Sequence, residues 1–439
     1  MPAPGSLTSL LDLRTHQERE FERIRARHLE GAPSPFIVTS LTDLVDEIVE
    51  YAAALAFGPD ASEAGTVPWA VVALGGYGRR ELNPFSDVDV MFLVEPGARE
   101  QVQAPSAQLF QMLWDLRYQL GHSLRTVDDC LELAKNDLTA QTALMEARLL
   151  LGSRPLFDQC RRRLTAAFRA KAFLRAKREE RKLAFERYGD TTSLLEPNVK
   201  RSPGGLRDLH AVKWVGLALH QTADWQALAA GGQLTASEAD LLQRHQAMLW
   251  QIRNDLHFHA GRATDVLSFD EQQRLAEAFG YRGERHLLPV EQFMQFYYRM
   301  TGEVRAICDR VYERAAPRRR EARWVDWFLT RRLGHFLLTD QTIAIRPESR
   351  QLASETPALV MKLYALAHQH NVDPADESSR IAAAAAEQFP SSAWHTTEIG
   401  RHFLAILKAP GRSASGGGAI ARTLRSMHKV RLLGRLLPA

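Results

Sequence analysis

The sequence predicts an α+β fold, in which a small sheet with flanking helices precedes a long helical region. Two apolar runs of strand type lie close together near residue 80: Trp69–Leu74, and a second run that carries Asp87 and Asp89 and ends at Val94. From Pro155 onward the chain consists almost entirely of charged segments with the apolar period of amphipathic helices. The sheet therefore belongs to the first part of the chain and the helical region to the rest.

The remaining elements follow from the same patterns. In chain order, we expect a helix over residues 7–31, a helix over Thr39–Phe57, a loop over Gly58–Pro68, a helix over Ala107–Leu120 and a short strand over Gly121–Val127. Asp128 is the expected N-cap of the helix after that strand. Phe336–Ile345, with Asp340-Gln341 at its centre, predicts a small hairpin within the otherwise helical second half.

Composition restricts the class of protein. A chain of 439 residues is long enough for two or three domains. Its 45% hydrophobic and 25% charged residues are typical of globular proteins, and a net charge of +4 gives no general case for nucleic-acid binding. The three cysteines are too few and too scattered for a disulfide framework or a zinc site.

No targeting or membrane signal is evident in the sequence. The first residues lack the basic segment and apolar core of a secretory signal. No run approaches the roughly 20 apolar residues that a membrane-spanning helix needs. We therefore expect a cytoplasmic protein that binds neither a membrane nor a nucleic acid.

The two strand-like runs carry a candidate chemical site. Gly75 and Gly76 end the first run, and without Cβ atoms they let the backbone approach a ligand closely. Asp87 and Asp89 belong to the second run and point to one face, because side chains alternate along a strand. Val88, Val90 and Phe92 point to the opposite face, into a core. Two carboxylates side by side repel each other unless they share a divalent cation, and Mg²⁺ prefers such oxygen ligands.

Gly75 and Gly76 can be compared with three known phosphate-binding sequence patterns. No Gly-Lys-Ser/Thr follows, which excludes a Walker site, and Glu81 replaces the third glycine of a dinucleotide fingerprint. The remaining pattern, Gly-Gly followed after ten residues by Asp-x-Asp, resembles the DNA polymerase β nucleotidyltransferase superfamily. That resemblance implies a polymerase β-like domain in which the glycine turn holds a triphosphate and the carboxylates hold two metals. The alternative is a surface turn followed by a strand with two exposed acids.

The superfamily also implies a third carboxylate, because two metals need more ligands than two acids supply. Glu146 is the first candidate, since Ala143–Gly152 could form a strand with Glu146 and Arg148 on one face. The alternative is a helix in which Glu146 is a surface acid. Asp128 is the second candidate for this ligand.

The loop Leu195–Leu209 interrupts the helical region. Two prolines stiffen it, and a Gly-Gly pair leads into a helix N-terminus, which can bind an anion through its free N–H groups. Lys200, Arg201 and Arg207 would add positive charge. The alternative is a domain linker followed by a capped helix.

Several motifs together give a closer resemblance. They are, in order, Gly75–Asp89, Gly121–Thr126, Glu196–Asp208, Ala260–Arg262 with Asp265, and Val290–Tyr298. In this order they resemble the bifunctional PII-protein uridylyltransferase/uridylyl-removing enzymes, over roughly residues 40 to 439. The resemblance implies Mg²⁺-dependent transfer of UMP from UTP to a tyrosine of the nitrogen-signalling protein PII, with Mn²⁺ as a possible substitute and glutamine as an effector.

The resemblance also assigns roles to individual residues and bounds to domains. Asp87, Asp89 and Glu146 would be the catalytic and metal-binding residues. The nucleotide would be bound by Gly75, Gly76, Arg79, Arg80, Ser86, Lys200 and Arg207. The domains would be an N-terminal helical extension (1–35), a nucleotidyltransferase domain (36–155), an all-helical domain (156–320) and a mostly helical segment leading into an HD domain (321–439).

The sequence also departs from this family. Family members continue into an HD hydrolase domain and two ACT domains, whereas Leu424–Pro438 resembles the segment just before the HD domain and no His-Asp dipeptide occurs. We therefore expect neither uridylyl removal nor a response to glutamine from these residues. Two alternatives to uridylylation stay open: transfer of another nucleotide such as AMP, or to another acceptor, and a non-catalytic regulatory role.

Overall fold

A computed structural model describes residues 9–58, 67–188, 191–284, 286–315, 331–339, 342–408 and 416–437. The chain divides into two units, Met1–Pro317 and Arg318–Ala439, and each has its own buried apolar core. Within the described ranges, no helix combines the length and the apolar character needed to cross a membrane.

The first unit contains the predicted small sheet. Its strands are β1 (Trp69–Ala73), β2 (Val88–Val94), β3 (Leu120–Arg125) and β4 (Arg148–Gly152), in the order β3-β2-β1-β4. β1 pairs antiparallel with β2 and with β4, whereas β2 and β3 run parallel. The sheet is therefore mixed, and the three strands expected near residues 69, 88 and 121 are confirmed.

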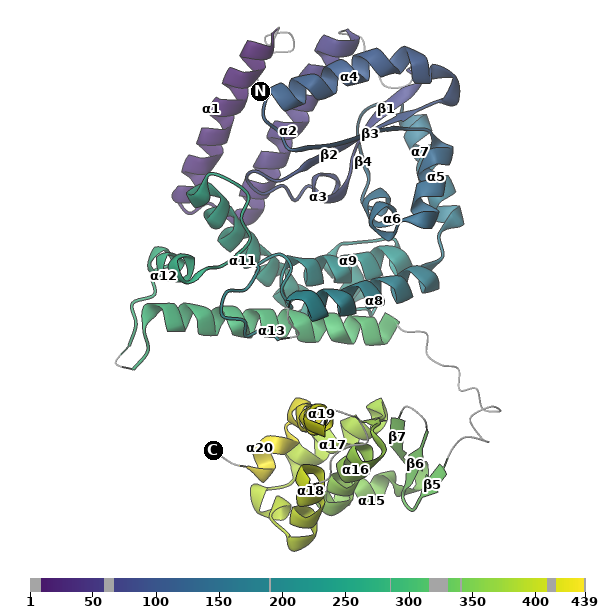
Figure 1. Ribbon diagram of the computed structural model, residues 1–439, viewed down its shortest axis with the longest axis vertical. Coiled ribbons are helices and arrows are strands. Elements are labelled where there is room, and N and C mark those ends of the chain that lie inside the picture. Colours follow the sequence, from purple (N-terminus) through teal and green to yellow (C-terminus); the bar gives the residue numbers. More distant parts are fainter. Residues whose placement is uncertain are drawn as a thin grey trace. The chain divides into compact units, whose positions relative to one another are not determined.

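Helices cover both faces of this sheet (Figure 1). One face packs on α2 (Ser34–Phe57) and α4 (Arg99–Asp115), with α1 (Leu10–Leu29) packed on α2. The other face packs on α5 (Val127–Asn136), α6 (Leu138–Met145) and α7 (Arg154–Ala167). Val90 and Phe92 of β2 point into the first core, as predicted. Met91 and Leu93 are also buried, on the face that carries Asp89, so this strand is apolar on both sides beyond the aspartates.

Two predicted helices have different bounds. α2 begins at Ser34 rather than Thr39, because proline is compatible with the first helical turn, where its missing N–H is not needed. The helix expected over Ala107–Leu120 spans Arg99–Asp115 instead, so it both begins and ends earlier than predicted. Arg117 then adopts a left-handed conformation, with φ of 65°, and turns the chain into β3.

The predicted N-cap of α5 is wrong. The cap is Thr126, whose side chain accepts a hydrogen bond from the backbone N–H of Asp129, while Asp129 accepts one in return from the N–H of Thr126. This reciprocal arrangement is a capping box with an aspartate in the third position. Asp128 lies inside the first turn instead.

The rest of the first unit is helical, as predicted. It comprises α8 (Ala170–Tyr188), α9 (Leu206–His220), α10 (Trp225–Ala230), α11 (Ala236–Ala260), α12 (Phe269–Ala278) and α13 (Pro289–Ala315). These helices share one core, in which Leu209, Ile252 and Val304 are fully buried. α9 and α11 also contact the residues that follow the glycine turn, as described below.

The second unit has a sheet that was predicted only in part. Its strands, in their order in the sheet, are β5 (Arg331–Leu333), β6 (Phe336–Leu338), β7 (Thr342–Ile345) and β8 (Asp373–Pro374). β6 and β7 form the predicted antiparallel hairpin, whose centre at Asp340-Gln341 lies outside the described residues. β5 and β8 are too short to show a period in the sequence. Within the described ranges of this unit, the helices are α15 (Arg350–Glu355), α16 (Pro357–His370), α17 (Asp376–Gln388), α18 (Thr397–Lys408), α19 (Gly416–Lys429) and α20 (Leu432–Leu436).

Candidate active site

Two glycines enclose the carboxylate of Asp89. After β1 the chain forms α3 (Gly75–Gly78), a single helical turn, and Leu74 donates its N–H to the carbonyl of Asp89 at 3.0 Å. Gly75 has a φ of 56°, and a Cβ atom there would lie 3.2 Å from Asp89 Oδ2. On the neighbouring strand, Gly121 is paired with Asp89, and a Cβ atom there would overlap Oδ1. Larger residues at either position would displace the carboxylate.

Asp87 and Asp89 form a charged pair at the start of β2. Asp87 is exposed and Asp89 is partly exposed, so both are within reach of a ligand. Burial and the negative charge of Asp87 raise the pKa of Asp89, and the charges of Lys200 and Arg79 only partly offset this. A carboxylate pair whose charges destabilise each other is a suitable donor set for a divalent cation. Asp87 and Asp89 therefore fit the predicted metal.

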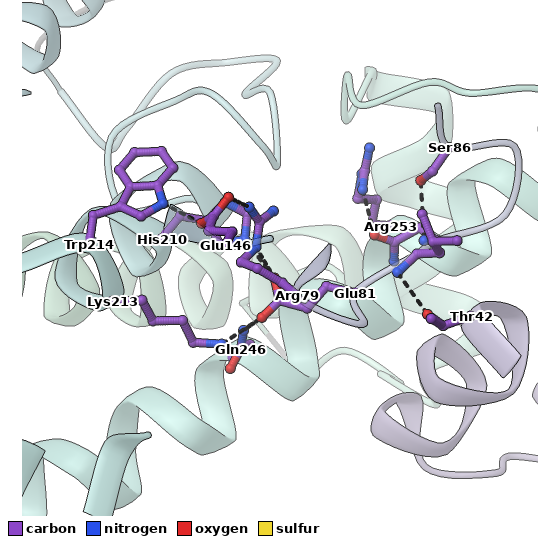
Figure 2. A network of polar contacts seen from close by, with 12 residues as sticks. Thr42, Arg79, Glu81, Ser86, Glu146, His210, Lys213, Trp214, Gln246 and Arg253 are labelled. Atoms are coloured by element: carbon purple, nitrogen blue, oxygen red, sulfur yellow. Dashed lines mark hydrogen bonds and ion pairs between the residues drawn. The ribbon is translucent and has the colours of Figure 1, made fainter. Parts of the chain in front are cut away.

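Glu146 occupies a different environment from the predicted one. It is the C-cap of α6 and precedes β4, so it does not share a strand face with Arg148. Arg79 Nη1 donates to Glu146 Oε2 at 2.6 Å, and Trp214 Nε1 donates to Oε1 (Figure 2). Burial raises the pKa of Glu146 in spite of the bond from Arg79. Both of its carboxylate oxygens are thus already engaged.

The structure does not gather the three predicted metal ligands. Within the described ranges, no three histidine, cysteine, aspartate or glutamate side chains lie close enough together to hold a metal. Asp128, the second candidate for the third ligand, is exposed and bonds to Arg163 Nη1 at 2.8 Å. The identity of a third carboxylate therefore stays a prediction.

The role of Glu146 is tested by Glu146→Gln. A glutamine keeps a partner for Trp214 but releases Arg79, and we expect nucleotide transfer to slow about tenfold to a hundredfold through misplacement of the glycine turn. Because both carboxylate oxygens of Glu146 are engaged by Arg79 and Trp214, we expect the Mg²⁺ concentration for half-maximal activity to stay unchanged. A raised Mg²⁺ requirement would instead make Glu146 the third ligand. Asp128→Asn is the control, and loss of activity there would assign that ligand to Asp128.

A buried carboxylate ties the glycine turn to two helices of the helical region. Glu81 accepts hydrogen bonds from Arg79 Nε at 2.9 Å, Lys213 Nζ at 2.5 Å, His210 Nε2 at 2.9 Å and Gln246 Nε2 at 3.1 Å. Figure 2 shows these side chains converging from α9, α11 and the segment after α3. The segment that follows the glycine turn is therefore fixed against α9 and α11 by charge as well as by packing.

The combined effect of burial and neighbouring charges lowers the pKa values of two members of this network, Glu81 and His210. Burial alone would raise the pKa of Glu81, but the charges of Lys213 and Arg79 outweigh it and hold the pKa well below its usual range. Burial, followed by the charge of Arg79, lowers the pKa of His210 to about 3. His210 is therefore neutral at physiological pH and donates from Nε2 to an ionised Glu81.

Arg80 and Ser86 were also predicted to bind the nucleotide. The guanidinium of Arg80 bonds to Asp43 and to Asp46 of α2, the latter at 3.3 Å. Ser86 Oγ accepts the backbone N–H of Asn83 at 3.1 Å and so closes the turn before the aspartates. Arg80 thus connects the segment after the glycine turn to α2, and Ser86 fixes the turn before Asp87. Contact of either side chain with a nucleotide stays a prediction.

The loop before α9 brings Lys200 to the aspartate pair. Asn198 Oδ1 accepts the N–H of Lys200 at 3.1 Å, and Lys200 O accepts the N–H of Arg207 at 2.9 Å, so the loop is fixed at both ends. Gly204 is required there, because it has a φ of 78° and a Cβ atom would overlap the backbone of Thr301. The predicted helix N-terminus after the Gly-Gly pair is confirmed at Leu206.

Lys200 is a poorly compensated cation. Burial and the charge of Arg253 lower the pKa of Lys200 to about 8, against the opposing charges of Asp265 and Asp87. Within the described part of the chain, its ammonium group forms no hydrogen bond or ion pair. Arg207 lies in the first turn of α9, 5.5 Å from the ring centre of Trp214. The positive charge of Lys200 is thus close enough to interact with the carboxylates of Asp87 and Asp89.

A second polar network, whose contacts were not predicted from the sequence, anchors the turn before Asp87. Arg253 Nε donates to Asp265 Oδ1 at 2.7 Å, and another nitrogen of its guanidinium donates to Asn83 Oδ1. His257 lies 3.2 Å from the same Asp265 oxygen and also bonds to the carbonyl of Pro84. The only signal in the sequence was the resemblance around Asp265, because Asn83 and Arg253 are 170 residues apart.

Comparisons with known proteins relate this chain to nucleotidyltransferases. Residues 172–312 match the family model described as GlnD PII-uridylyltransferase. Residues 7–128, which include the glycine turn and the aspartate pair, match the family model described as glutamate-ammonia ligase adenylyltransferase.

Curated relatives of this chain are named as the enzymes that its motifs resemble. A bifunctional uridylyltransferase/uridylyl-removing enzyme of Pseudomonas entomophila is 42% identical over 246 residues, which are 56% of this chain and 27% of the relative. A namesake from Cupriavidus pinatubonensis is 44% identical over 229 residues, 52% of this chain and 26% of the relative. The resemblance stated from the motifs is confirmed over this part, and the chain spans about a quarter of the length of the relatives it matches.

Proposed function

We propose that this chain, which is related to the bifunctional uridylyltransferase/uridylyl-removing enzymes over more than half of its length, transfers UMP from UTP to a tyrosine of a PII protein. The observation that carries the proposal is the aspartate pair beside the glycine turn, in a mixed four-stranded sheet. The acceptor is inferred from the names of the relatives.

In the proposed reaction, the acceptor hydroxyl oxygen attacks the α-phosphorus of the nucleotide, and the bond to pyrophosphate breaks. Asp87 and Asp89 would hold Mg²⁺, which lowers the pKa of the attacking hydroxyl and stabilises charge on the leaving phosphates when bound. Gly75 and Gly76 let the triphosphate approach the backbone. The protein itself contributes position and electrostatics rather than a covalent intermediate.

Lys200 is the side chain best placed to meet the triphosphate. It is close enough to Asp87 and Asp89 for their charges to interact, and it is held by a loop with little freedom. A phosphate group would supply the anionic partner that it lacks among the described residues. Arg207 would add charge from the first turn of α9, whereas Arg79 would act by holding the glycine turn.

The proposal predicts a pH dependence of nucleotide binding. Since the pKa of Lys200 is lowered to about 8, the ammonium loses its proton as pH rises above that value, and affinity for a non-reactive UTP analogue should fall. Lys200→Met should weaken binding at pH 7 by about tenfold or more, as expected for loss of a charged hydrogen bond. Isothermal titration across pH 6.5 to about 9.5, spanning the shifted pKa of this amine, measures both effects.

Two further variants make this test specific. Lys200→Arg keeps its charge throughout that range, so its affinity should stay level above pH 8. Lys171, exposed on α8, supplies the matched control Lys171→Met, which should bind as the wild type does. An unchanged decline with pH in Lys200→Arg would remove Lys200 from the nucleotide site.

A second candidate function is transfer of AMP. It is favoured by one observation: the family model that covers Asp87 and Asp89 is that of an adenylyltransferase. Neither aspartate distinguishes one base from another, because both act on phosphates and metal.

The two nucleotides, and a non-catalytic role, are separated by one experiment. The chain is incubated with Mg²⁺, a PII protein and each α-labelled nucleoside triphosphate in turn, with Asp89→Asn as the blank. Label transferred from UTP alone supports uridylylation, and label transferred from ATP alone supports the second candidate. No transfer from any triphosphate, in a folded protein that binds nucleotide, would support a regulatory role.

A further inference from the structure

A large cavity lies on the face of the sheet that carries Asp89. Its volume is about 800 Å³, and it extends between the sheet, α5, α6, α7 and the end of α9. Met91 and Leu93 of β2 form part of its wall, on the same strand face as Asp89. Figure 1 shows α5, α6 and α7 together on this side of the sheet. Cavities of this size are in the range of small-molecule sites.

The walls of the cavity are mostly apolar. Met145 of α6, Phe157 of α7 and Leu217 of α9 complete the surface that Met91 and Leu93 begin. An apolar or aromatic group would replace water against these side chains, which is the favourable term in binding such a ligand.

The charged residues of the cavity are all basic. Arg161 and Arg162 line it from α7 and are both exposed, and among the described residues that line it none is an acid. Arg161 has a weak partner, Asp158, one turn away at 3.4 Å. Arg162 has no ion pair or hydrogen bond within the described residues. An anion at this position would meet a guanidinium without displacing an internal partner.

We propose that this cavity binds an amphipathic organic anion, with its apolar body against β2 and α7 and its acid group at Arg162 and Arg161. The ligand would touch Met91, two residues from Asp89, and Met145, which precedes Glu146. An effect of the ligand on nucleotide transfer rests on the proposed function, but binding itself does not. The test therefore measures binding alone.

The probe is 1-anilinonaphthalene-8-sulfonate, which combines aromatic rings with a sulfonate and fluoresces in apolar sites. The wild type should bind it saturably, with one site per chain. Ala134 lines the cavity, so Ala134→Trp should fill it and remove most of the signal. Arg162→Glu, a surface change, should weaken binding roughly tenfold through reversal of one charge.

Matched variants outside the cavity control for unfolding and for net charge. Ala167→Trp, on the exposed end of α7, and Arg175→Glu, on the exposed surface of α8, should bind the dye as the wild type does. Decanoate should displace the dye, whereas decyltrimethylammonium, with an equally long chain and a positive charge, should not. Equal displacement by both, or unchanged affinity in Arg162→Glu, would overturn the proposal.

Discussion

Asp89→Asn is expected to reduce nucleotide transfer at least roughly a thousandfold, because a catalytic metal supplies several kcal/mol of charge stabilisation and one of its ligands would be lost. The fold should persist, since Asp89 has an elevated pKa and its ionised form is disfavoured in the folded protein. A neutral side chain of the same shape relieves the repulsion from Asp87. The melting temperature in metal-free buffer should therefore stay equal or rise.

The measurement is transfer of labelled nucleotide over a range of Mg²⁺ concentrations, alongside thermal unfolding with and without Mg²⁺. Asp87→Asn should behave like Asp89→Asn, and Mg²⁺ should stabilise neither variant as much as the wild type. Asp240→Asn, an exposed aspartate on α11, is the matched control and should remain active. Near-normal turnover in either Asp87→Asn or Asp89→Asn would show that the pair does not hold the catalytic metal.

The largest expected effect on stability is that of Glu81→Gln. The substitution keeps the shape of the side chain but leaves Lys213 without the charge that compensates it in a buried site, and leaves Arg79 with Glu146 as its remaining carboxylate partner. Removing one partner of a buried ion pair typically costs roughly 3 to 5 kcal/mol. Chemical denaturation of the two proteins measures this loss. Glu22→Gln, which removes an exposed pair with Arg25, is the control and should cost about 1 kcal/mol or less.

The same variant has a defined pH dependence. The folded protein holds the pKa of Glu81 below its usual value of 4.5, so this carboxylate stabilises the fold above that pH and ceases to do so as pH falls through the lowered pKa. The stability difference between wild type and Glu81→Gln should be full at neutral pH and should shrink below pH 4.5. A difference that does not change with pH would mean that Glu81 acts by packing alone.

Most of the correct predictions about the fold and the site rest on residues that are close together in the sequence. The strand, the glycine turn and the aspartate pair all lie within Trp69–Val94, where alternation and the absence of a Cβ atom have direct local consequences. The placement of Asp89 between Gly75 and Gly121 follows from strand pairing that this local pattern already favours.

Interactions over long sequence separations could not be predicted. Glu81 looked like an interruption of a glycine motif, because its partners His210 and Gln246 lie 129 and 165 residues away. Glu146 was chosen because Ala143–Gly152 could form a strand with Glu146 and Arg148 on one face. No local pattern could reveal that α6 ends at Met145 or that the carboxylate meets Arg79 and Trp214.

The most direct measurement is the intact mass of a PII protein after incubation with this chain, UTP and Mg²⁺, followed by peptide mapping. We expect the mass of each PII subunit to increase by one UMP, attached to a tyrosine, and no increase with Asp89→Asn or without Mg²⁺. A PII protein whose mass stays unchanged with UTP, while the chain is folded and binds the nucleotide, would contradict the proposed function.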